Sequence, residues 1–135
     1  TADAATAGDE AAARWLRQNA PANTVFATDR TSSAPPPAEE DGISNLYTAF
    51  SGVQCYMEGW TYAMSNMGVP QAEVEHRRAV VAELFDPDTP AETLVTLCRE
   101  EGITCLVDCD RWPGQVNPAL TPAYRKGGVA IYWIC

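Results

Sequence analysis

The sequence has few basic residues and a single histidine. Nine lysines and arginines stand against eighteen aspartates and glutamates, so that the formal net charge is −9. A charge of this sign repels nucleic-acid phosphates and anionic lipid surfaces, which argues against a nucleic-acid-binding protein. His76 lies among charged residues of a predicted helix, and no G-x-S-x-G motif supplies a serine that it could activate. We therefore expect His76 to be an exposed residue and predict no catalytic residue.

Long apolar runs, a secretory signal and paired cysteines are also missing. No run approaches the ~20 apolar residues that a membrane-spanning helix needs, and the opening TADAATAGDE lacks the basic and apolar stretches of a signal peptide. We expect a soluble piece, whose abrupt start is as compatible with a cut edge as with a native start. The cysteines are odd in number and form no C-x-x-C pair, which argues against a disulfide scaffold. They are predicted to be buried free thiols, with one pair across adjacent strands as the alternative: Cys55, Cys98, Cys105, Cys109 and Cys135.

A chain of 135 residues, 46% of them hydrophobic, is large enough for one domain with its own core. Asp9 is the expected N-cap of a first helix, and Gly52 is the expected end of a short second helix. A fourth helix should open on the motif T-P-A-E at residues 89–92, a capping box with proline at the first helical position, and end at Gly102. The four predicted helices cover residues 9–19, 45–52, 70–85 and 90–101. Between the first two, prolines and acidic residues at 31–42 predict a mobile loop.

Three short apolar runs predict the strands of a parallel sheet. The last predicted helix leads into the third strand with almost no connection, as in the second half of a βαβ crossover. Gly127-Gly128 separates two further strand-like runs and predicts an antiparallel hairpin. The expected fold over residues 1–135 is therefore a three-layer α/β domain with a mainly parallel sheet of about three strands, a C-terminal antiparallel hairpin and helices on both faces. The three predicted parallel strands are residues 24–28, 53–57 and 103–107.

Charged and aromatic residues follow each of these three strands directly. Ligands of open α/β sheets bind beyond the carboxyl ends of the parallel strands, so this edge is the predicted ligand site. Its arginines suit a carboxylate or phosphate, and its tryptophans offer flat apolar walls of the kind that stack on sugar rings. The structural alternative is that the arginines pair with neighbouring acids and the tryptophans close the end of the core. The ligand-binding candidates are Arg30, Glu58, Trp60, Asp110, Arg111 and Trp112, with Asp29 and Asp108 beside them.

Asp108-Cys109-Asp110 has the D-x-D form with which some nucleotide-sugar glycosyltransferases hold a divalent metal. Oxygen-ligand sites need more carboxylates than one pair, and the chain has no Gly-rich phosphate loop. We therefore predict neither a metal nor a cofactor, and expect Asp108 to be a ladder or capping residue. The tyrosines and methionines of residues 56–67 are expected to pack in the core and in a lid, or, if exposed, to form a docking face.

Four segments occur in a recognisable order: ARWLRQNAPANTVFATDR, SGVQCYMEGWTYA, EEGITCLVDCDR and GGVAIYWI. Together they span most of the chain, from about Ala12 to Ile134. The pattern resembles the soluble C-terminal domain that ends many bacterial polytopic membrane proteins related to the C-type glycosyltransferases. The matching positions are Glu58, Gly59 and Trp60, and, in the closing strand, Gly128, Val129, Ile131 and Tyr132.

The resemblance implies a function that the residues alone do not. In those proteins a multi-spanning part transfers sugars from lipid-linked donors, and an α/β domain lies on the extracytoplasmic side. The chain would then be a non-catalytic accessory domain at the extracytoplasmic face of a bacterial membrane. Its partners would be the transmembrane part of the same polypeptide and a glycan or lipid-linked sugar, because its role would be to position the acceptor or the donor. Two alternatives stay open: a free-standing soluble module that binds an anionic metabolite through Arg30 and Arg111, and a ligand-free assembly domain.

Overall fold

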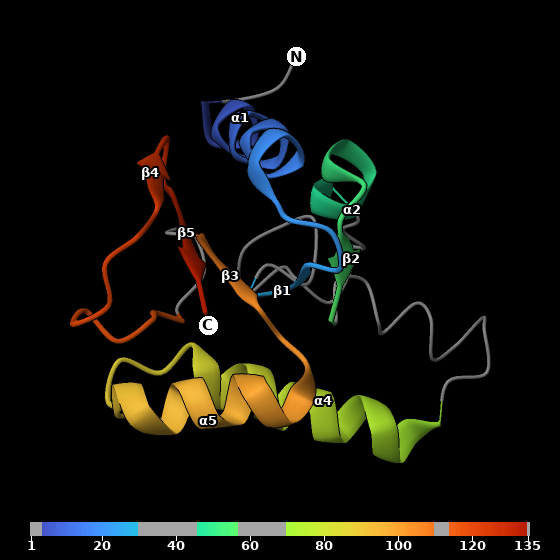
Figure 1. Cartoon of the computed structure of the whole chain (residues 1–135), viewed down its shortest axis with the longest axis vertical. Helices are drawn as coiled ribbons and strands as arrows, with labels where there is room; N and C mark the ends of the chain where they lie inside the picture. The colour runs from blue at the N-terminus through green and yellow to red at the C-terminus, as the bar shows by residue number, and fades with distance from the viewer. Residues whose placement is uncertain (1–3, 30–45, 57–69, 110–113, 135) are drawn as a thin grey trace.

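The centre of the structure is a five-stranded mixed sheet (Figure 1). Its strands are β1 (Val25–Thr28), β2 (Gln54–Cys55), β3 (Cys105–Cys109), β4 (Tyr124–Lys126) and β5 (Val129–Trp133). They come from a computed structural model that describes residues 4–29, 46–56, 70–109 and 114–134. The strand order is β2-β1-β3-β5-β4. β1 pairs in parallel with β2 and β3, whereas β5 pairs antiparallel with β3 and β4.

The α/β class and the C-terminal hairpin are confirmed, but the sheet is not mainly parallel. Two of the four described pairings are parallel and two are antiparallel. The reason is that the hairpin joins the sheet through its second strand, so that β5 lies beside β3 and adds an antiparallel ladder to the one within the hairpin.

The hairpin turn follows the glycine pair that predicted it. Gly127 and Gly128 have φ values of 61° and 80°, and Lys126 pairs with Val129 across them. A two-residue turn with positive φ at both positions matches the right-handed twist of the flanking strands, and glycine adopts it without a steric penalty. The turn is therefore determined by local chemistry.

Helices lie on both sides of the sheet (Figure 1). Residues of α1 (Ala4–Asn19) and α2 (Leu46–Ser51) share one apolar cluster with Phe26 and Val107. Residues of α4 (Gln71–Leu84) and α5 (Ala91–Glu101) share a second cluster with Ala27 and Leu106. Successive residues of β1 and β3 thus point to opposite cores, which explains why the sequence of these strands lacks polar alternation.

The third parallel strand begins two residues later than predicted. Gly102 has φ 75°, and the N–H of Ile103 donates to the carbonyl of Cys98 at 2.8 Å. This bond and the left-handed glycine close the end of α5 in a Schellman arrangement, so Ile103 belongs to the helix cap and not to the strand. The strand also ends two residues later than predicted, because Asp108 and Cys109 pair with Ala130 and Val129 of β5. Both residues, predicted to lie at the tip beyond the strand, are therefore buried within β3.

Two predicted helix caps are wrong. α1 begins at Ala4, so Asp9 lies inside the helix, where it is 2% exposed and accepts a hydrogen bond from the hydroxyl of Tyr47. The hydroxyl of Thr89 donates to the carbonyl of Glu83 at 2.7 Å instead of capping α5, whose N-cap residue is Pro90 without a side-chain cap bond. In both cases a tertiary or turn partner takes the polar group that local sequence assigns to a cap.

The four described cysteines are free thiols; Cys135 lies outside the described residues. Phe26 pairs with Cys55 on one side and with Cys105 on the other, so these two thiols are two strand spacings apart. That separation is about 9–10 Å, beyond the roughly 7 Å that a disulfide bridges, and it rules out this pairing. Burial raises the pKa of the Cys98 thiol to about 12 and also raises that of Cys105. Both thiols are therefore protonated and unreactive at neutral pH.

None of the helices within the described ranges combines the length and the apolar character needed to cross a bilayer.

Candidate functional site

All six ligand-binding candidates lie outside the described residues: Arg30, Glu58, Trp60, Asp110, Arg111 and Trp112. The structure does describe the chain just before them. Asp29 precedes Arg30, Tyr56 lies two residues before Glu58, and Cys109 precedes Asp110. These three residues end or directly follow the three mutually parallel strands β1, β2 and β3, which are neighbours in the sheet. The predicted site therefore stays a prediction. The structure places the residues at the strand ends from which it would begin.

Two aspartates stand side by side at this carboxyl edge. The register pairs Thr28 with Val107, so Asp29 and Asp108 are the next residues of neighbouring strands. Oδ1 of Asp29 accepts the N–H of Cys109 at 3.2 Å, and Oδ2 of Asp108 accepts the N–H of Val116 at 3.1 Å. Each carboxylate thus binds a second segment of main chain to its own strand. Asp108 also lies in the ladder between β3 and β5, as the sequence predicted.

The chain closes tightly over Asp29 from the side of α4. The N–H of Gln115 donates to the carbonyl of Phe85 at 2.7 Å. A Cβ atom on Gly114 would lie 2.8 Å from the Cβ of Phe85 and 3.3 Å from Oδ2 of Asp29. Only glycine fits between them without a shift of the backbone or of Phe85, so residues 114–116 form one fixed wall of the carboxyl edge.

Behind the same edge lies a buried polar cluster that sequence reasoning missed. The hydroxyl of Tyr47 on α2 donates to Oδ1 of Asp9 on α1 at 2.6 Å, and Sγ of Cys109 lies 3.6 Å from that hydroxyl. Burial, reinforced by Cys109 and Asp9, raises the pKa of Tyr47 far above its ordinary value, so it is a permanent donor. One signal was present: Asp9 shares the helix face of Ala12, Ala13 and Leu16, where a carboxylate needs a partner.

A second polar cluster anchors the end of β2 to α4 and α5. Oε1 of Glu101 accepts the hydroxyl of Tyr56 at 2.6 Å and lies 2.9 Å from Nε2 of His76. Arg77 donates to the carbonyl of Tyr56 at 2.7 Å, and its guanidinium carbon lies 4.5 Å from the centre of the tyrosine ring. The side chain of His76 is 53% exposed, as predicted, but it is bound to Glu101. Because β2 has only two ladder residues, this cluster supplies much of what fixes its end.

Replacing Glu101 by glutamine should weaken the domain at neutral pH and not in acid. The hydrogen bond from Tyr56, with further help from His76, lowers the pKa of Glu101 below its ordinary value. A carboxyl whose pKa falls on folding stabilises the folded state above its unfolded pKa, and that contribution is lost as the pH falls through the folded pKa. Urea unfolding of wild type and Glu101→Gln should therefore differ at pH 7, and the difference should shrink as the pH falls below the ordinary glutamate pKa of about 4.3. Glu100→Gln, an exposed neighbour, controls for the loss of one charge; a gap that persists in acid would contradict the prediction.

No group of three or more histidine, cysteine, aspartate or glutamate side chains within the described ranges is arranged to hold a metal ion. Asp108 of the D-x-D motif is 8% exposed and bound to the main chain of Val116, while Asp110 lies outside those ranges. Asp108, the one carboxylate of the motif that the structure describes, thus has a structural role.

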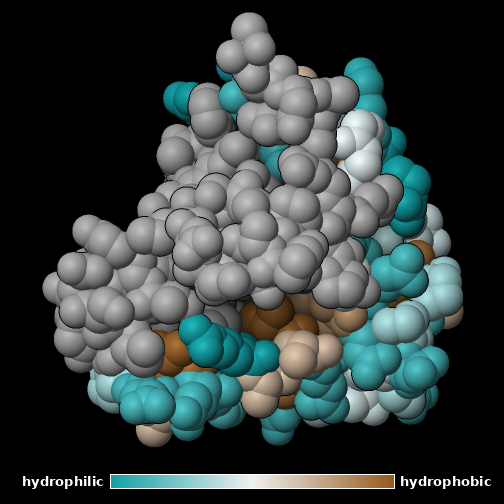
Figure 2. Space-filling model, turned by 180° about the vertical axis from the view of Figure 1, so that it is seen from behind, coloured by the Kyte–Doolittle hydropathy of each residue, from teal (hydrophilic) through white to brown (hydrophobic). Residues whose placement is uncertain are grey.

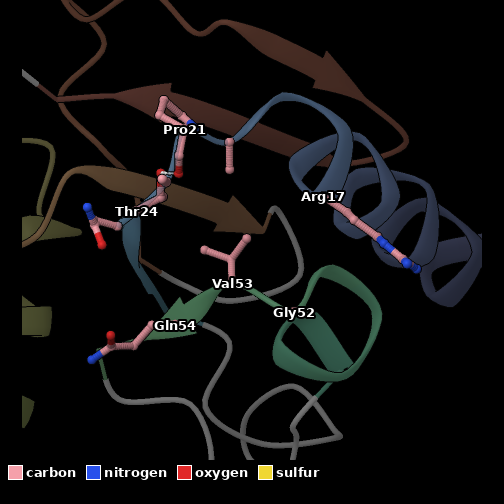
Figure 3. A pocket seen from close by; sticks show the side chains of 9 residues that line it. Arg17, Pro21, Thr24, Gly52, Val53 and Gln54 are labelled. Carbon is pink, nitrogen blue, oxygen red and sulfur yellow. Dashed lines mark hydrogen bonds between the residues drawn. The ribbon is translucent and has the colours of Figure 1, made fainter.

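A shallow hollow of about 340 Å³ lies at the opposite, amino edge of the sheet (Figure 3). It is lined by the end of α1 and by the chain around Gly52 and Val53. Figure 3 shows that the side chains of Arg17 and Gln54 point away from each other and from Val53. A binding site needs polar groups that converge on one ligand, and these diverge. The amino edge is therefore a weaker candidate than the carboxyl edge.

On the face seen from behind, the described residues are mostly hydrophilic, and their apolar side chains lie mainly in the lower middle of the view (Figure 2). Tyr56, the first residue of the segment that was considered for docking, is 3% exposed and packs in the core; residues 57–67 lie outside the described ranges.

Searches of protein-family models, of curated proteins and of solved structures found no match to this chain. Function must therefore be inferred from its own residues, and the carboxyl edge of β1, β2 and β3 stays the predicted site.

Proposed function

We propose that the chain is a non-catalytic accessory domain of a membrane protein related to the C-type glycosyltransferases. Its three-layer α/β fold would position an acceptor or a lipid-linked sugar donor at the carboxyl edge of β1, β2 and β3. The family in this proposal comes from the resemblance of the sequence, and one observation supports the location of the site. The side chain of Asp29 accepts the main-chain N–H of Cys109, so the residues that directly precede Arg30 and Asp110 are in contact.

The composition of these segments fits a sugar phosphate. The phosphate of a lipid-linked sugar suits the planar fork of an arginine, and two arginines, Arg30 and Arg111, follow neighbouring strands. Trp60 and Trp112 supply rings of the kind on which sugars stack, and Glu58 supplies an acceptor for sugar hydroxyls.

A role without catalysis is supported by the chemistry of the described residues around this edge. The one histidine of the chain, His76, lies on α4 and is bound to Glu101. The thiol of Cys109 is 2% exposed and contacts Asp9, so it is shielded from a ligand. Under this proposal the chemistry belongs to the transmembrane part of the same polypeptide, at the extracytoplasmic face of a bacterial membrane.

Removal of either arginine should weaken binding of a soluble donor analogue. We expect Arg30→Ala and Arg111→Ala each to raise the Kd for a short-chain prenyl-phosphate monosaccharide at least tenfold, because a charge-assisted bond to phosphate contributes about 1.5–3 kcal/mol. Isothermal titration calorimetry measures this. Arg99→Ala, at the exposed end of α5, is the matched control and should leave the Kd unchanged.

The same titration separates the alternatives. If wild type does not bind the analogue, the proposal fails. Equal affinity for a sugar phosphate without the prenyl chain would instead favour the free-standing module for anionic metabolites. An equal loss in Arg99→Ala would show that the arginines act through net charge and not through a site.

A further inference from the structure

The geometry points to Tyr47 as a positioning residue for the carboxyl edge: its hydroxyl, through Asp9, holds the end of β3 in place. This inference rests on the proposed function for its effect on a ligand, but not for its effect on the edge itself. Tyr47 does not end or follow a parallel strand, and it would act only through the residues that it contacts.

The last residue of β3 is held from two directions. Sγ of Cys109 lies 3.7 Å from Oδ1 of Asp9 and 3.6 Å from the hydroxyl of Tyr47. The main-chain N–H of Cys109 donates to Asp29 at the end of β1. Side-chain contacts with α1 and α2 and a main-chain contact with β1 thus converge on the residue that precedes Asp110.

The same cluster extends to β2. The hydroxyl of Ser51 donates to the carbonyl of Tyr47, and the N–H of Val53, one residue before β2, donates to the hydroxyl oxygen of Ser51 at 3.0 Å. The bond from Ser51 uses the main-chain carbonyl of residue 47, so it ties α2 to β2 whatever side chain stands there. The hydroxyl of Tyr47 reaches β3 through Cys109, whose N–H contacts Asp29 at the end of β1.

The hydroxyl and the ring of Tyr47 have separate uses. The ring is fully buried and packs edge-on against Phe26, with centroids 6.1 Å apart, and a phenylalanine would keep this contact. The hydroxyl serves Asp9, a carboxylate that is costly to bury. Well-packed apolar groups often stabilise a fold as well as a buried polar cluster does, whereas directional hydrogen bonds select one arrangement. We therefore assign to this cluster the role of fixing one arrangement of the carboxyl edge, and not that of raising stability.

Local hydrogen exchange tests the assignment without any ligand. In Tyr47→Phe we expect the amide of Cys109 to exchange about tenfold faster, because loss of the hydroxyl loosens the thiol and the bond to Asp29. The amide of Ile103, bonded to Cys98 on the other side of the sheet, should change less than twofold. Equal acceleration at both amides would reveal a general loss of stability, and no change at Cys109 would remove the positioning role. Either result overturns the inference.

Conservative variants keep the test informative if Tyr47→Phe folds poorly. Asp9→Asn retains an acceptor for the tyrosine hydroxyl, and Cys109→Ser retains a donor, so in both variants the amide at position 109 should exchange within about twofold of wild type. The double variant Asp9→Leu/Tyr47→Phe removes the buried charge together with its partner and should fold, yet should show the faster exchange at Cys109. A double variant with wild-type protection at Cys109 would contradict the inference.

Ligand binding supplies the second readout. With the prenyl-phosphate monosaccharide as probe, Tyr47→Phe should raise the Kd about fivefold, whereas Asp9→Asn, which keeps the hydrogen bond, should bind with nearly the wild-type Kd. If wild type does not bind the probe, the proposed function fails while the exchange measurements still decide the positioning role. Faster exchange at Cys109 with an unchanged Kd would show that the edge is held by Tyr47 but that the ligand does not depend on it, which overturns the part concerned with the ligand.

Discussion

Replacement of Leu106 by alanine is expected to lower the free energy of unfolding by about 2–5 kcal/mol. Leu106, the second residue of β3, is fully buried between Ala27 on β1 and Tyr132 on β5. Its side chain belongs to the apolar cluster shared with α4 and α5. Truncation would lose the transfer free energy of three carbon groups and leave a cavity where three segments of sheet and a helix layer meet, with little freedom to collapse.

Urea denaturation followed by circular dichroism measures this loss. Leu97→Ala is the matched control, because Leu97 lies on α5 and is only partly buried against the same cluster. The control should lose clearly less, since part of its side chain is already in water. Similar losses for the two variants would contradict the placement of Leu106 at the centre of the core.

Gly8→Ala is expected to destabilise the domain by roughly 1–3 kcal/mol, although alanine is the better helix former by about 1 kcal/mol. A Cβ atom on Gly8 would overlap the carbonyl oxygen of Gly127 and lie 3.0 Å from its carbonyl carbon. These atoms belong to the main chain of the hairpin turn, and Gly8 lies within α1, so neither segment can move aside as a flexible side chain would. The clash should therefore outweigh the gain in helix propensity.

Thermal unfolding of Gly8→Ala and of Ala11→Gly tests the sign. Ala11 is exposed on the same helix, so Ala11→Gly reports helix propensity alone and should cost about 1 kcal/mol. Replacing alanine by glycine would then lower stability at position 11, and replacing glycine by alanine would lower it at position 8. A rise in Tm for Gly8→Ala would show that α1 and the hairpin do not approach as closely as described.

Elements governed by neighbouring residues could be predicted from the sequence. The glycine pair 127–128 predicted the hairpin, and Gly102 predicted the end of α5, because positive φ favours glycine irrespective of the rest of the fold. The long helix expected over residues 70–85 is α4 (Gln71–Leu84), since its apolar residues recur with a helical period.

Both wrong helix caps assigned a polar group to a neighbour in the sequence. Asp9 and Thr89 were expected to cap helices, but Asp9 binds Tyr47 and Thr89 binds Glu83. The aspartate and the tyrosine are 38 residues apart, so no local pattern links them. The start of β3 failed for a related reason, because the cap of α5 takes the N–H of Ile103 first.

For the candidate site, the sequence showed which residue types follow the predicted strands and predicted the edge of the sheet at which those strands end. Parallel strands place their carboxyl ends together, so the apolar runs at residues 24–28 and 103–107 predicted that these ends are neighbours, and the pairing of Thr28 with Val107 confirms it. The buried cluster of Asp9, Tyr47 and Cys109 could not be predicted in the same way. It depends on how α1 and α2 pack over β3, which is set by the shapes of many apolar side chains at once.

By itself, then, the sequence determined the hairpin turn, the end of α5 at Gly102, the α/β class and the edge of the sheet at which β1 and β3 end together. These follow from backbone sterics and from hydrophobic period, which act over a few residues. Only the tertiary structure decided which partner each buried polar group takes and that β5 lies beside β3. A hydrogen-bonding group binds whichever partner packing brings within about 3 Å, and packing brings together residues from α1, α2 and β3 that are distant in the chain.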